Sequence, residues 1–158
     1  MRMRKKKNLD TRFAACANVM ITEPQMQKGK WHEVFSNENP IHLEIGCGKG
    51  RFIMEMAKRH PEINFVAVER EEGALIMATE KARELELSNL KFMSFDAAQL
   101  GDVFEHEEVD RIYLNFSDPW SPNRQRRRRL THADYLDVYN NILRETGDLC
   151  FKTDNQRL

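Results

Sequence analysis

The chain contains few cysteines, and their spacing excludes the sites that cysteines usually build. Only Cys16, Cys47 and Cys150 occur, and no two of them stand at the short spacing of a metal-binding pair. An odd, scattered set also gives no disulfide framework, which is typical of a protein kept reduced in the cytoplasm. The five histidines show no ligand spacing. We therefore predict a cytoplasmic protein without a metal site.

The chain also lacks a hydrophobic run that could cross a membrane. The longest apolar stretch, residues 13–21, is interrupted by Asn18, and a spanning helix requires roughly 20 apolar residues. Asp10 and Arg12 stand just before this stretch and no clean cleavage site follows it, which argues against a signal peptide. With 158 residues, 41% hydrophobic and 32% charged, we expect one globular domain and no membrane partner.

A surplus of one charge is missing as well, because 25 basic and 25 acidic residues give a formal net charge of zero. This balance excludes a protein that coats nucleic acid through its overall charge. The basic residues are nonetheless clustered, first over residues 2–7 and again at Arg124, Arg126, Arg127, Arg128 and Arg129. Local clusters on a neutral chain indicate directed contact with an anionic partner.

Apolar runs and amphipathic stretches alternate from residue 41 onward. We expect residues 1–40 to form a basic arm and a polar lead-in, and residues 41–158 to form the main domain. Short β-rich runs predict five strands, over 41–45, 64–68, 90–95, 111–116 and 148–152. Helices are predicted over 51–60 and 71–87, and a third is expected to be capped by Thr131 and to end at Gly147. This alternation predicts an α/β fold with a parallel sheet covered on both faces.

A glycine-rich turn follows the first predicted strand, where Gly46, Gly48 and Gly50 alternate with other residues. Glycines there let the backbone turn tightly and approach a ligand. A dinucleotide-binding turn would have its third glycine at the position of Arg51. Glu44, just before the turn, would repel a phosphate but attract the cationic end of S-adenosyl-L-methionine. The sign of this charge favours S-adenosyl-L-methionine as the cofactor.

Further carboxylates follow the second and third predicted strands. Glu69 stands about 20 residues past the turn, at the distance where an acidic side chain accepts both ribose hydroxyls of a bound nucleoside. Asp96 follows the third strand and could accept the exocyclic amine of adenine. The alternatives are a surface glutamate at Glu69 and a turn or helix cap at Asp96.

The fourth predicted strand ends in Asn115-Phe116-Ser117-Asp118-Pro119-Trp120. Ligands of open parallel sheets bind beyond the carboxyl ends of the strands, near the point where the strand order reverses. Polar groups and an aromatic ring at that place can hold a flat base by edge contacts and stacking. A proline turn with a packed tryptophan is the structural alternative. We predict Asp118 as the catalytic residue.

Four segments together resemble the tRNA (guanine-N7-)-methyltransferase family. They are Glu44 to Gly50, Tyr113 to Trp120, Arg128 to Thr131 and Phe151 to Asn155. The resemblance implies a Rossmann-like class I methyltransferase fold with strand order 3-2-1-4-5. It implies methyl transfer from S-adenosyl-L-methionine, which leaves S-adenosyl-L-homocysteine, to N7 of a guanine in the tRNA variable loop. It also implies that Glu44, Glu69, Asp96 and Asp118 line the cofactor site and that Asp154 contacts the substrate.

Two features depart from the family pattern. Pro122 stands where the family usually has a lysine that contacts the substrate, which would weaken or redirect RNA binding. The sequence also ends at Leu158, just past the fifth predicted strand. Relatives continue with the last strands of the sheet and a Thr-x-x-Glu substrate segment, so we expect a domain incomplete at its C-terminal end.

The expected chemistry needs little more than placement of the reactants. Guanine N7 carries a lone pair and no proton, so it can attack the sulfonium methyl without a general base. The ring becomes cationic as it is methylated, and the Asp118 carboxylate would stabilise this charge or bind the guanine N1 and N2 hydrogens. The arginines from Arg124 to Arg129 would bind tRNA phosphates.

Three other functions remain open from the sequence. A nicotinamide-dependent oxidoreductase is disfavoured by Arg51 and by the lack of an obvious acid or base for hydride transfer. A methyltransferase for an exocyclic amine would carry an Asn-Pro-Pro-Tyr type loop, and the prolines near Asn115 stand in the wrong places. A non-catalytic RNA-binding or assembly subunit is compatible with the early end of the sequence.

Overall fold

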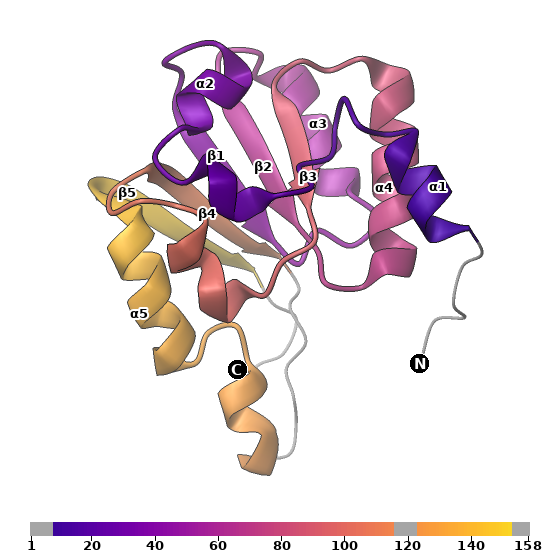
Figure 1. Ribbon diagram of the computed structural model, residues 1–158. Coiled ribbons are helices and arrows are strands. Elements are labelled where there is room, and N and C mark those ends of the chain that lie inside the picture. Colours follow the sequence, from indigo (N-terminus) through magenta and orange to yellow (C-terminus); the bar gives the residue numbers. More distant parts are fainter. Residues whose placement is uncertain (1–7, 116–122, 153–158) are drawn as a thin grey trace.

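Five parallel strands form the central sheet of the computed structural model, which describes residues 8–115 and 123–152 (Figure 1). They are β1 (Ile41–Ile45), β2 (Asn64–Val68), β3 (Leu90–Met93), β4 (Val109–Asn115) and β5 (Leu143–Lys152). Their order across the sheet is β3-β2-β1-β4-β5, and every neighbouring pair is parallel. The strand order therefore reverses between β1 and β4, as predicted, and the α/β fold class is confirmed.

Helices cover both faces of the sheet (Figure 1). One face is covered by α1 (Leu9–Ala14), α3 (Arg51–Arg59) and α4 (Glu72–Leu85). The other is covered by α2 (Trp31–Phe35), the 3-10 helix η2 (Ala97–Asp102) and α5 (Ala133–Ile142). The remaining short helices are η1 (Pro24–Gln27) and η3 (Asn123–Arg128). Within residues 8–115 and 123–152, each helix is too short or too polar to pass through a lipid bilayer.

The two faces of the sheet bury two separate hydrophobic clusters. Along β2, Val66 and Val68 belong to the cluster under α2, η2 and α5, whereas Phe65 and Ala67 belong to the cluster under α3 and α4. This division follows from the two-residue period of a strand, and β2 reads as a continuous apolar run because both of its faces are covered. The same alternation places the side chain of Glu44 on the α3 side of β1, opposite its neighbours along the strand.

The described part of the lead-in, residues 8–40, packs against the domain. Val19 and Ile21 flank a bridge to β3, in which the Ile21 amide donates to the Phe92 carbonyl at 2.8 Å and the Phe92 amide donates to the Val19 carbonyl at 2.7 Å. Trp31 is fully buried, and its indole Nε1 donates to the Val103 carbonyl at 2.9 Å. The lead-in therefore supplies part of the core and shields one edge of the sheet.

The junction between α5 and β5 differs from the prediction. The chain enters β5 at Leu143, directly after α5, so Gly147 lies inside the strand and does not end the helix. Here β5 carries extra residues opposite β4, because Val109 pairs with Leu143 while Arg111 pairs with Asp148. A turn residue in the sequence thus marks an irregular strand pairing.

Other predicted boundaries need smaller corrections. The expected cap at Thr131 is wrong, because His132 caps α5 and its Nδ1 accepts from the Asp134 amide at 3.2 Å. The third strand ends at Met93 and not at Phe95, and the predicted helix over 71–87 spans only Glu72–Leu85. A histidine ring nitrogen can accept a hydrogen bond from a backbone amide at the start of a helix, as the side-chain oxygen of threonine does.

The close backbone approach at Gly147 gives a prediction about stability. A Cβ at this position would lie 2.7 Å from the Asp110 carbonyl oxygen and 3.0 Å from the Arg144 carbonyl oxygen. We expect Gly147→Ala to lower the free energy of unfolding by roughly 1–3 kcal/mol, as other forced contacts do. Urea denaturation measures this. The control is Gly101→Ala, where a Cβ would meet open space, and equal midpoints for the two variants would contradict the prediction.

Candidate active site

Polar side chains gather at the carboxyl ends of the central strands. Glu44 is near the end of β1, Glu69 follows β2, Asp96 follows β3, and Asn115 is the last residue of β4. Parallel strands bring their carboxyl ends to one edge of the sheet, and the strand order reverses there between β1 and β4. The structure therefore brings Glu44, Glu69 and Asp96 to a common edge, while Asp118, the fourth carboxylate predicted at the cofactor site, lies outside the described residues.

The glycine loop after β1 has the backbone conformation that requires glycine. Gly46, Gly48 and Gly50 have φ values of 78°, 58° and 79°, in the left-handed region. The Gly46 amide donates to the Val68 carbonyl at 2.8 Å, which ties the loop to the end of β2. A Cβ at Gly50 would lie 3.0 Å from the Ala78 Cβ, whereas a Cβ at Gly48 would meet nothing within 4 Å. The loop is thus packed at its helix end and open at its middle.

Glu44 is a nearly fully buried carboxylate with an exposed fraction of 2%. Its Oε2 accepts from Asn115 Nδ2 at 2.9 Å. Its Oε1 has no hydrogen-bond partner among the residues that the structure describes. Burial raises the pKa of Glu44 to about 7, the Asn115 hydrogen bond lowers it, and the negative charge of Glu69 raises it. One oxygen of this carboxylate is therefore available to a cationic ligand.

Glu69 is fixed by backbone amides around the loop. Its Oε2 accepts from the Gly48 amide at 3.0 Å, and its Oε1 accepts from the Glu71 amide at 3.2 Å. Each carboxylate oxygen has a second lone pair, so these bonds leave acceptor capacity. The side chain is only partly buried. Glu69 is therefore a rigid acceptor beside the open middle of the loop, as a residue that binds ribose hydroxyls would need to be.

Asp96 has a local structural role at the same edge. It caps η2, and its Oδ1 accepts from the Ala98 amide at 3.0 Å. The helix cap, which was the structural alternative for Asp96, is therefore present. A cap of this kind occupies one carboxylate oxygen, so it does not preclude contact with a ligand amine.

The arginine-rich segment lies close to the glycine loop. Arg126, Arg127 and Arg128 are exposed on η3. The next turn of chain is anchored, because Tyr139 Oη donates to the Leu130 carbonyl at 2.9 Å. Leu130 Cδ1 lies 3.8 Å from the position that a Cβ would take at Gly46. The same segment thus presents cationic side chains and, at Leu130, lies close to the glycine loop.

Several predicted residues cannot be placed. Asp118 and Asp154 lie outside the described residues, as do Pro122 and the side chain of Arg124. Two residues near the site were not predicted from the sequence, namely Asn115 as the partner of Glu44 and Leu130 close to the glycine loop. The feature of the sequence that could have indicated this role for Asn115 is its position at the carboxyl end of β4, the strand beside β1, which carries Glu44.

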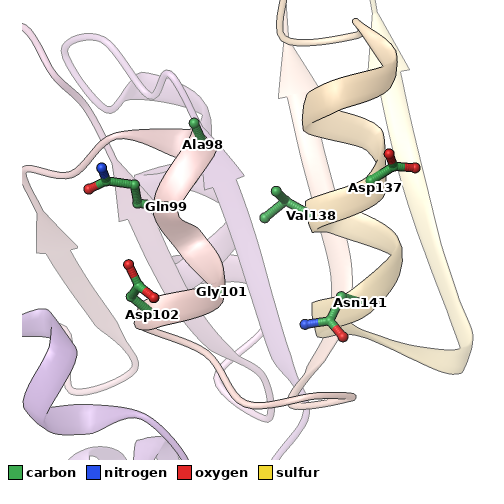
Figure 2. A pocket seen from close by; sticks show the side chains of 7 residues that line it. All are labelled: Ala98, Gln99, Gly101, Asp102, Asp137, Val138 and Asn141. Carbon is green, nitrogen blue, oxygen red and sulfur yellow. The ribbon is translucent and has the colours of Figure 1, made fainter.

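A separate hollow of about 350 Å³ lies between η2 and α5. Figure 2 shows Gln99 and Asp102 on the η2 side and Asp137 and Asn141 on the α5 side. Its lining includes neither the glycine loop nor Glu44, so we place the candidate active site at the strand ends. Across the part of the chain that the structure describes, no three His, Cys, Asp or Glu side chains gather as metal ligands would.

Comparisons with known proteins identify the family of this chain. A family model described as "Putative methyltransferase" matches residues 38–158. The curated tRNA (guanine-N(7)-)-methyltransferases of Halalkalibacterium halodurans and Bacillus subtilis are 47% and 46% identical over 158 residues. These matches cover 100% of this chain and 72% and 74% of the two relatives.

Solved structures with low sequence identity share the fold. The Haemonchus contortus phosphoethanolamine N-methyltransferase 2, solved in complex with S-adenosyl-L-methionine, superposes with a TM-score of 0.59 at 14% identity. The match covers 95% of this chain and 34% of that chain. The strand order and the Rossmann-like class I methyltransferase fold are thereby confirmed for the described part of the chain.

The buried carboxylate predicts a pH-dependent stability. The folded-state pKa of Glu44 is raised from 4.5 to about 7, so its contribution to folding is fully present below pH 4.5 and is lost as pH rises to about 7. A shift of this size corresponds to roughly 3 kcal/mol. We expect Glu44→Gln to abolish this loss, so that the variant gains stability over the native chain as pH rises.

Urea denaturation at intervals between pH 5 and pH 8 measures the effect. Glu55→Gln is the control, because Glu55 is an exposed glutamate on α3. Its stability curve should run parallel to that of the unchanged chain. If the Glu44→Gln curve were parallel as well, burial of Glu44 would not govern its ionisation.

Proposed function

Because the chain belongs to the tRNA (guanine-N(7)-)-methyltransferase family, we propose that it transfers a methyl group from S-adenosyl-L-methionine to N7 of a guanine in tRNA. The observation that supports this most directly is the buried Glu44 carboxylate beside an open glycine loop. The other functions considered from the sequence are not favoured, because the relatives that match the whole chain are named for N7 methylation. An enzyme acting on tRNA would work in the cytoplasm.

The residues of the candidate site fit S-adenosyl-L-methionine better than a phosphate ligand. Glu44 Oε1 is buried and lacks a partner among the described residues, so it can accept from the cofactor's ammonium group. Glu69 beside Gly48 would accept from the ribose hydroxyls, and Asp96 from the adenine amine. Three carboxylates at this edge of the sheet would repel phosphate oxygens. The charge of the site therefore selects a cationic cofactor.

The proposed chemistry depends on placement of the reactants. When bound, S-adenosyl-L-methionine supplies an electrophilic methyl group on its sulfonium sulfur. Guanine N7 has a free lone pair, so the protein has no proton to remove, and orienting the two partners can lower a barrier by roughly 7–11 kcal/mol in favourable cases. Asp118, three residues past the last residue of β4, would stabilise the growing positive charge or bind the guanine N1 and N2 hydrogens.

The exposed arginines of η3 would bind the tRNA backbone. Arginine matches phosphate oxygens with a planar fork of donors. Arg126 and Arg127 are exposed, and Leu130, two residues beyond the helix, lies close to the glycine loop. Phosphates held by Arg124 to Arg129 would therefore lie near the cofactor, and Asp154 would contact the substrate as family resemblance implies.

The activity is tested by isotope-labelled methyl transfer to bulk tRNA, with the labelled base identified by mass spectrometry. We expect the label at N7 of guanine. Asp118→Asn keeps the size of the side chain and removes its charge, so we expect turnover to fall at least about tenfold while cofactor binding stays within twofold. Turnover close to that of the unchanged chain would remove Asp118 from the reaction centre.

The arginine contacts predict a salt-dependent interaction with tRNA. The double variant Arg126→Ala and Arg127→Ala should weaken tRNA binding and flatten the plot of log affinity against log salt by roughly 1–2 in slope. Filter binding from 50 to 300 mM salt measures this. Arg59→Ala, an exposed arginine at the end of α3, is the matched control and should leave the slope unchanged. Equal slopes for both variants would exclude phosphate contacts at Arg126 and Arg127.

A further inference from the structure

Asn115 is the side chain that hydrogen-bonds the buried carboxylate of Glu44 among the residues that the structure describes. It is the last residue of β4, and β4 pairs with β1 so that Tyr113 stands opposite Glu44. Asn115 is two residues farther along the same face, which brings its amide Nδ2 within 2.9 Å of Glu44 Oε2. The contact joins strands that are neighbours in the sheet but 71 residues apart in the chain.

This hydrogen bond orients the Glu44 carboxylate and opposes the effect of burial on its ionisation. An amide N–H can donate to a carboxylate, and the bond favours the charged form over the protonated form. It occupies Oε2 and leaves Oε1, which is buried and has no partner among the described residues. The bond therefore fixes which oxygen faces a neighbour and which oxygen remains open to a ligand.

We propose that Asn115 is a positioning residue for cofactor binding, because it holds Glu44 charged and oriented so that its second oxygen accepts the ammonium group of S-adenosyl-L-methionine. This inference rests on the proposed function, since it assumes that cofactor. It gives Asn115 a role through Glu44 rather than through contact with the guanine.

The groups around Glu44 differ in their effect on its pKa. Burial raises the pKa of Glu44, and Glu69 raises it further, while the Asn115 bond lowers it. Cys47 is also near, but burial and the two glutamates raise the pKa of its thiol, so Cys47 stays neutral. The hydroxyl of Tyr113, the residue opposite Glu44 on β4, accepts a hydrogen bond from Arg111 Nη1. Within the described residues, Asn115 is thus the group that favours ionisation of Glu44.

Two substitutions separate this role from simple packing. Asn115→Asp has nearly the same shape but replaces the donor with a carboxylate, so two acids would share the site and Glu44 would hold its proton to higher pH. Asn115→Ala removes the donor and also leaves space. A positioning role predicts that Asn115→Asp disturbs Glu44 more than Asn115→Ala does, whereas a packing role predicts the reverse order.

The titration of Glu44 is measured directly by carbon-13 NMR of glutamate-labelled protein without cofactor, with the Glu44 signal identified by its loss in Glu44→Gln. We expect the Glu44 midpoint to rise by about one pH unit in Asn115→Ala and by more in Asn115→Asp. Asn89→Ala is the structural control. Asn89 donates to three carbonyls near the end of α3, so its loss should lower stability without moving the midpoint.

Cofactor affinity is then measured by calorimetry from pH 6 to pH 9. At pH 7 we expect Asn115→Ala to bind S-adenosyl-L-methionine roughly fivefold more weakly, because a one-unit rise from a pKa of about 7 lowers the ionised fraction of Glu44 from about one half to about one tenth. Most of this loss should be recovered at pH 9. The ammonium group of the ligand titrates in the same way with every variant, so it cancels in the comparison. In a Glu44→Gln background, Asn115→Ala should have little further effect.

The outcomes separate this inference from the proposed function. If the unchanged chain failed to bind the cofactor at every pH, the proposed function would fail, while the NMR midpoints would still decide whether Asn115 governs Glu44. If the chain bound the cofactor but Asn115→Ala and Asn115→Asp kept the native midpoint and pH profile, the positioning role would be overturned. Weakening that was equal at all pH values would overturn it too.

Discussion

A carboxylate buried at the carboxyl end of the central strand is the constraint on which the site depends. Glu44 has an exposed fraction of 2% and receives one hydrogen bond among the described residues. An ionised group in such a place costs free energy unless a partner of opposite charge is supplied. The apo protein meets this cost by holding the proton to about pH 7. A cationic ligand would offset the free-energy cost of ionising Glu44. Burial of this carboxylate would therefore favour a cationic ligand over a neutral or anionic one.

The sheet topology explains how such a site arises from distant parts of the chain. The reversal of strand order between β1 and β4 leaves the carboxyl ends of these strands side by side with no helix crossing between them. Asn115 then reaches Glu44 across the strand pair, and Glu69 reaches the Gly48 amide from the end of β2. The first of these contacts joins the end of β4 to β1, and the second joins the end of β2 to the loop after β1. The fold therefore fixes the geometry of the site before any ligand binds.

Much of this arrangement could be predicted from local patterns. Short β-rich runs gave β1 and β2 at their observed limits, and the glycine spacing gave the tight turn after β1. The error at Gly147 has a different origin. A glycine after a helix usually ends it, but this glycine is required by the approach of the Asp110 carbonyl on another strand. Long-range contacts of this kind leave no local periodicity.

The residues near the candidate site also fall into two groups, those whose position follows from local sequence and those whose contacts depend on long-range packing. Glu69 was predictable because its distance from the loop along the chain is set by the length of a strand-helix-strand unit. The pairing of Asn115 with Glu44 depends on the register between β1 and β4, which a single sequence does not specify. The packing of Leu130 on Gly46 depends on a further crossing of the chain, held by the buried Tyr139.

That last contact connects the two halves of the proposed reaction. Leu130 follows the arginine-rich helix, and its carbonyl is held by a tyrosine with an exposed fraction of 1%. A rigid anchor of this kind limits how far the arginines can move relative to the glycine loop. Phosphates bound at Arg126 and Arg127 would therefore be positioned relative to the cofactor by the core itself. Since the proposed chemistry requires placement more than acid or base catalysis, the buried tyrosine would act on it through the geometry that it maintains.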